Sequence, residues 1–87
     1  MDLFKSWLRC DITKGMFPGE YTVVAKTVDG QKISLFAPSS FVNEQQKLLA
    51  VRILEKSISN YLVFLPVTPM EISSRVIKVA PNTVVQE

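Results

Sequence analysis

The amino-acid sequence predicts a small, mostly β domain: five or six short antiparallel strands in a bent sheet or partly open barrel, with one short helix. Two observations support this fold class. Segments rich in β-branched residues alternate with turns that contain glycine, proline, serine or asparagine. The chain also has 87 residues, enough for one core and too few for a two-sheet sandwich of immunoglobulin size. We therefore expect residues 1–87 to form a single domain.

The first strand is expected from Trp7 to Thr13, after a loose or helical start. Apolar residues at the beginning of the chain fall at helical spacing, whereas apolar and polar residues alternate after them. This alternation places Leu8, Cys10 and Ile12 on one face of the strand. The period of two therefore favours a strand over a continued helix.

The clearest local prediction is a β-hairpin. After a turn at residues 15–19, the segment Tyr21–Val28 is rich in β-branched residues, as is typical of a strand. Asp29-Gly30 tolerates the positive φ that both central positions of a tight hairpin turn require. Gln31–Phe36 is the expected partner strand, and Ala37-Pro38 ends it.

A short helix and a second hairpin are expected next. Ser39–Lys47 begins with serines suited to an N-cap and predicts a short capped helix. The apolar residues of Leu48–Lys56 scatter around a helical wheel but alternate along a strand, so a strand is favoured over a longer helix. Ser57–Asn60 then predicts a turn into a strand at Tyr61–Leu65.

The last part of the chain is expected to add a loop and one or two strands. Pro66 and Pro69 bracket the loop, because proline cannot donate a hydrogen bond within a central strand. Arg75–Val79 predicts the final long strand, which Ala80–Asn82 ends. Val84-Val85 is expected to add a short edge contact. Closure of the sheet would also remove exposed strand edges.

Few residues suited to catalysis or metal binding are present. The chain has no histidine, which removes the commonest general base and metal ligand. A single cysteine, Cys10, cannot form an intramolecular disulfide or a structural zinc site. Asp11 and Glu20 flank one turn and could converge, although solvated charges are the favoured interpretation. We assign no catalytic, cofactor-binding or metal-binding residue, and we expect no enzymatic activity.

Several residues have both a structural and a functional interpretation. Cys10 lies between apolar neighbours and is interpreted as a small buried hydrophobe rather than a nucleophile. Met16 and Phe17 could contact a partner from their turn. The favoured interpretation is that Phe17 folds back and plugs the end of the barrel. For three further aromatic residues the sequence does not separate core cover from partner contact: Trp7, Tyr21 and Tyr61.

Charge and hydropathy limit the expected partners and location. Ten basic and eight acidic residues give a formal net charge of +2, and no two basic residues are adjacent. Because clustered cations dominate nucleic-acid affinity, we expect no strong nucleic-acid binding. Charges interrupt the apolar residues near the start, unlike a signal peptide, and no apolar run is long enough to span a membrane. These features predict a cytoplasmic protein without a membrane partner.

The expected function is a non-enzymatic interaction or assembly module, with a homo-oligomer or a larger protein as its partner. Leu48–Leu54 and Tyr61–Leu65 are apolar on both faces and so need cover on both. Outer side chains facing water would form a contiguous apolar patch, and cover by Ser39–Lys47 is the alternative. The alternative function is a small β-barrel that binds single-stranded nucleic acid through aromatic residues, although the scattered charge argues against it.

Overall fold

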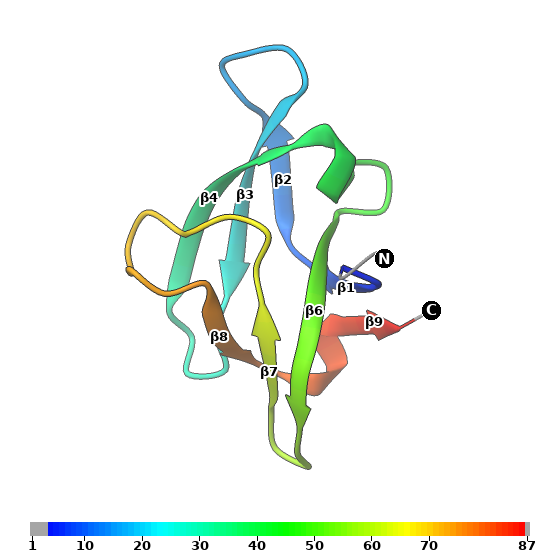
Figure 1. The fold of residues 1–87 in the computed structure, drawn as a ribbon, viewed down its shortest axis with the longest axis vertical. Coiled ribbons are helices and arrows are strands. Elements are labelled where there is room, and N and C mark those ends of the chain that lie inside the picture. The colour runs from blue at the N-terminus through cyan, green and yellow to red at the C-terminus, as the bar shows by residue number, and fades with distance from the viewer. Residues whose placement is uncertain (1–3, 87) are drawn as a thin grey trace.

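The computed structural model describes residues 4–86, which form two antiparallel sheets of six and three strands (Figure 1). The mostly β fold class is therefore confirmed. In chain order the strands are β1 (Ser6–Arg9), β2 (Asp11–Lys14), β3 (Glu20–Lys26), β4 (Lys32–Pro38), β5 (Val42–Asn43), β6 (Leu48–Lys56), β7 (Tyr61–Phe64), β8 (Val76–Val79) and β9 (Val84–Gln86). The helical elements of the described residues are two 3₁₀ turns, η1 (Ser39–Phe41) and η2 (Pro81–Thr83).

The three-stranded sheet has the order β2-β3-β4 and contains the first predicted hairpin. β3 and β4 pair along their whole lengths, from Glu20 opposite Pro38 to Lys26 opposite Lys32. The connecting turn occupies residues 27–31 and is longer than the two-residue turn expected from the sequence. Within the turn only Gly30 has a positive φ, 89°, because the hydrogen bond from Thr27 N to Gln31 O closes a wider loop.

β6 is the central strand of the larger sheet, whose order is β8-β7-β6-β1-β9 with β5 also paired to β6. β1 pairs with the first half of β6, Leu48 to Val51. β7 pairs with the second half, Arg52 to Lys56, which confirms the second hairpin and the strand assignment. The register shifts between Ile53 and Glu55, so Leu54 forms a β-bulge.

The C-terminal elements also follow the expectations. A loop with Pro66 and Pro69 separates β7 from β8, and β8 pairs with β7. β9 pairs with β1, so Val84-Val85 makes the expected edge contact. β1 and β9, which are far apart in the sequence, therefore lie side by side in the six-stranded sheet, and β9 is one of its edge strands.

The short helix expected at Ser39–Lys47 is wrong, because only η1 at its beginning is helical. Pro38 precedes η1, and no side-chain cap stabilises a helix N-terminus there. β5 then pairs with β6, which gives its backbone groups partners in the sheet instead of in a helix. Lys47 adopts a left-handed φ of 59° and turns the chain into β6.

The single strand expected from Trp7 to Thr13 is divided into β1 and β2, which belong to different sheets. The division lies at Cys10, whose backbone N donates to Lys47 O at 3.0 Å. The alternation of apolar residues continues across Cys10, so the sequence contains no sign of this change of partner. The described residues therefore form nine strands instead of five or six, and neither sheet closes into a barrel.

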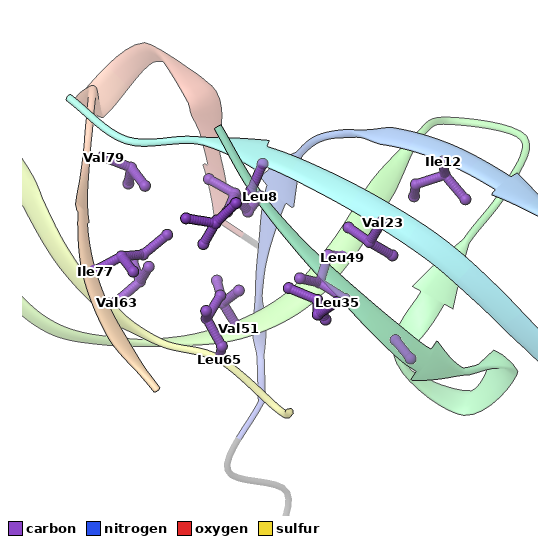
Figure 2. Packing of buried hydrophobic residues seen from close by; sticks show 13 residues of the cluster. Leu8, Ile12, Val23, Leu35, Leu49, Val51, Val63, Leu65, Ile77 and Val79 are labelled. Atoms are coloured by element: carbon purple, nitrogen blue, oxygen red, sulfur yellow. The ribbon is translucent and has the colours of Figure 1, made fainter. Parts of the chain in front are cut away.

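Both sheets contribute to one cluster of buried side chains (Figure 2). Figure 2 shows Ile12, Val23 and Leu35 of the smaller sheet packing toward the side chains of β6, β7 and β8. The complete cluster is Leu8, Ile12, Val23, Ala25, Ile33, Leu35, Ala37, Leu49, Val51, Val63, Leu65, Ile77 and Val79. A main-chain hydrogen bond from Val28 N to Lys78 O, 2.8 Å long, also joins the β3–β4 turn to β8.

Candidate functional site

The β2–β3 loop, residues 15–19, projects from one end of the molecule (top of Figure 1). Gly15 N donates to Glu20 O at 2.9 Å, and Glu20 N donates to Phe17 O at 3.2 Å. Gly19 has a φ of 79°, a conformation that glycine adopts without strain. These contacts hold the loop in a defined arch above the strands that it joins.

Two large apolar side chains are exposed on this loop. Met16 is 85% and Phe17 is 67% exposed. The expectation that Phe17 folds back and plugs the end of a barrel is therefore wrong. The loop extends beyond the end of the sheets. Tyr21, in β3, packs against the core instead of Phe17. The hydroxyl of Tyr21 donates to Glu44 Oε1 at 3.1 Å, and this hydrogen bond raises the pKa of Tyr21.

The loop encloses a shallow hollow of about 350 Å³, lined by residues 14–21. The charges at its two ends are Lys14 and Glu20, the last residue of β2 and the first of β3. No buried side-chain polar atom of the described residues lacks a hydrogen bond. The loop therefore presents the apolar side chains of Met16 and Phe17, with one positive and one negative charge at its base.

Cys10 has a protonated thiol at neutral pH. Burial, followed by the charge of Asp11, raises the pKa of the Cys10 thiol to about 12. The half-buried side chain packs against the edge of the core cluster, and its Sγ donates a weak hydrogen bond to Leu8 O at 3.4 Å. A thiol in this state is a small hydrophobe, since the thiolate is the nucleophilic form.

Asp11 and Glu20 do not converge. The antiparallel register places Asp11 opposite Val24, whereas Glu20 lies opposite Pro38 at the other end of β3. Along β3, position 24 is four residue steps from position 20, which is about 13 Å in an extended strand. Residues 4–86 also contain no group of three or more cysteine, aspartate or glutamate side chains that could hold a metal ion.

The outer face of β6 and β7 does not form the contiguous apolar patch considered above. Leu48 is 7% and Ala50 is 3% exposed. Phe64 lies against the Phe4 ring, with centroids 6.2 Å apart, and under the Arg75 guanidinium at 4.4 Å. Phe41, from the segment that was expected to cover this face, packs edge-on against Phe4 at 5.3 Å. The chain therefore covers much of this face itself.

Charged side chains occupy both outer edges of the three-stranded sheet. On β2, Lys47 Nζ donates to Ile12 O at 3.0 Å. On β4, Ser34 N donates to Glu71 Oε1 at 2.7 Å, and this hydrogen bond lowers the pKa of Glu71. Charges at an edge oppose pairing with another strand. Neither residue is recognisable from the local sequence, because the partners of Lys47 and Glu71 are 35 and 37 residues away along the chain.

The remaining aromatic candidates are integrated into the sheet. Trp7 lies half-buried on the face of β1 opposite Leu8. Tyr61 packs against the core, and Lys56 Nζ lies 5.8 Å from its ring centroid. The cation–π contact covers part of this ring. Phe17 therefore offers more exposed aromatic surface than either of these side chains.

The described helical elements give no indication of a membrane span: none is long and apolar enough. No protein-family profile, curated protein or solved structure matches this chain.

Proposed function

We propose that this protein is a non-enzymatic interaction module that binds another protein through the β2–β3 loop. The observation that supports the proposal is the exposure of Met16 and Phe17 side by side in a loop fixed by hydrogen bonds. Exposed aromatic residues that insert into a partner often supply most of the binding energy of an interface. A loop already held in one conformation also loses less entropy on binding.

The composition of the loop favours a partner surface with an apolar pocket. Phe17 supplies a rigid ring, and Met16 supplies a flexible side chain that adapts to irregular surfaces. Lys14 and Glu20 would lie at the rim of such an interface, where charges set orientation and specificity. Enzymatic activity has little support, because the chain lacks histidine and burial keeps the Cys10 thiol protonated. The cytoplasmic location stays a prediction.

Photo-cross-linking in the native cell tests this proposal. A photoreactive phenylalanine analogue in place of Phe17 should give a specific cross-link to a protein. The matched control places the same analogue at Ile58, a fully exposed apolar residue of the β6–β7 turn. Equal cross-linking from both positions would show that exposure alone explains the contact. Cross-links from position 17 only to nucleic acid or lipid would reject a protein partner.

A further inference from the structure

A second concave surface lies at the other end of the three-stranded sheet. The β3–β4 turn meets β8 there (Figure 1), and together they enclose a hollow of about 260 Å³, here called the turn hollow. Its apolar lining comes from Val28, Ile72 and the buried Ile77. Asp29 and Lys78 add one negative and one positive charge. The turn hollow therefore combines an apolar surface with two opposite charges.

Hydrogen bonds hold the turn hollow in shape. Val28 N donates to Lys78 O at 2.8 Å, and Gly30 N donates to Thr27 O at 3.0 Å. The Thr27 hydroxyl also donates to the Asp29 carboxylate, which lowers the pKa of Asp29. Asp29 is therefore charged at neutral pH. A surface of this kind exists before its ligand arrives, which reduces the entropic cost of binding.

The turn hollow and the β2–β3 loop have complementary features. The hollow is smaller than the pockets that hold drug-sized ligands, and its size suits a single side chain. The loop offers the exposed ring of Phe17, with Lys14 and Glu20 at its base. Lys14 is opposite in charge to Asp29, and Glu20 is opposite in charge to Lys78. We propose that the β2–β3 loop of one copy inserts Phe17 into the turn hollow of a second copy.

The contact must join two molecules. The seven residues of β3 separate the loop from the β3–β4 turn, a distance of about 20 Å along a rigid strand. A molecule therefore cannot place its own loop in its own hollow. Each copy carries one loop and one hollow, so the contact forms either a reciprocal dimer or a head-to-tail chain.

The expected association is weak. One loop in one hollow buries less area than the roughly 1,000 Å² typical of stable interfaces. Docking between copies rests on the proposed function, because a second copy of this chain is then the protein that the β2–β3 loop binds. Sedimentation velocity over a wide range of protein concentration is the suitable measurement, because it detects complexes in rapid exchange.

Two variants that damage opposite halves of the contact provide the test. Phe17→Ala removes the inserted ring, and Val28→Asp places a charge on the apolar surface of the hollow. The unmutated protein should form complexes as its concentration rises, whereas each variant alone should have a dissociation constant at least about tenfold higher. An equimolar mixture of the two variants should regain a complex, because one supplies an intact loop and the other an intact hollow.

The controls distinguish docking between copies of this chain from binding of the β2–β3 loop to a different protein. Ile58→Ala, at the tip of another hairpin, should associate like the unmutated protein. Asp29→Lys is a second hollow variant in case Val28→Asp does not fold. A monomer at about 1 mM, or a mixture that gives no complex, overturns docking between copies. Cross-links from position 17 to a different protein would then still support the proposed interaction module.

Discussion

The β6–β7 pair and the β2–β3 loop are both rich in apolar side chains, but the fold treats them in opposite ways. The sequence raised the possibility of an exposed face at Leu48–Leu65, and the structure buries the first half of β6 on both faces. Phe17 was expected in the core, and it lies on the surface. The difference shows that the place of a segment in the fold, and not its apolar composition, decides whether its side chains are buried. β6 has paired strands along both edges, whereas the loop extends past the end of both sheets.

The same contrast exists within β6. Leu49 is completely buried, between β1 on one side and β5 on the other. Leu54 is 43% exposed at the β-bulge, although it lies in the same strand. The pair of leucines therefore separates the effect of position from the effect of residue type.

Truncation of these two leucines should give the largest difference. Leu49→Ala removes a fully buried side chain and leaves a cavity, so the free energy of unfolding should fall by about 2–5 kcal/mol. Leu54→Ala should change it by about 0.5 kcal/mol or less. Urea denaturation of both variants measures the two values. Equal losses would mean that the second half of β6 is also buried, for example in an oligomer.

Two phenylalanines provide the second comparison. Phe64→Ala removes a half-buried ring from its contacts with Phe4 and Arg75, and should lower the free energy of unfolding by about 2 kcal/mol. Phe17→Ala should leave stability within about 0.5 kcal/mol and should weaken partner binding. Thermal unfolding followed by circular dichroism tests the stability difference. An unchanged melting temperature for Phe64→Ala, together with a smaller oligomer, would identify the β6–β7 face as an interface.

A loop glycine should matter more for stability than the exposed loop side chains. Gly19→Ala introduces a side chain at a φ of 79°, where no neighbouring atom would contact the new Cβ. The cost is therefore conformational, about 1 kcal/mol, or a few degrees in melting temperature. Met16→Ala should have no measurable effect on stability. A Gly19→Ala variant as stable as the unmutated protein would show that the loop relaxes into another conformation.

Thiol reactivity should distinguish Cys10, just before β2, from position 17 in the β2–β3 loop. Because the pKa of Cys10 rises from 9.0 to about 12, its thiolate fraction at pH 8 should be on the order of a thousandfold below that of an ordinary cysteine. Iodoacetamide should therefore modify Cys10 very slowly in the folded protein. A cysteine at position 17, introduced as Phe17→Cys with Cys10→Ala, should react at the rate of a free thiol. Equal rates would mean that the segment around Cys10 opens readily.

The same shift predicts how alkaline pH affects stability. The folded state retains the Cys10 proton more strongly than the unfolded state does. The contribution of the Cys10 thiol to the free energy of unfolding is therefore fully present below about pH 9, and it is lost as the pH rises toward about 12. The Cys10→Ala variant should lose less stability over this interval, which denaturation at several pH values would measure.

Local patterns predicted the strands of the two hairpins, but they did not predict the division between β1 and β2 or the short strand β5. The β-branched segments, the Asp29-Gly30 turn and the alternation in Leu48–Lys56 each depend on neighbouring residues, and both hairpins follow from them. Ser39–Lys47 was mispredicted, because its backbone finds partners in β6 that a local pattern does not reveal. The candidate site was predicted only in part. Met16 and Phe17 were recognised as possible contacts, but their exposure was not.

The sequence by itself determined a mostly β chain without histidine and with two hairpins, since pairing between adjacent strands follows from local residue preferences. Only the tertiary structure decided that Cys10 marks the change from one sheet to the other and that Phe17 lies outside the core. It also brought the β3–β4 turn against Lys78. These features depend on contacts between distant segments, and burial is a property of the assembled sheets rather than of any single segment.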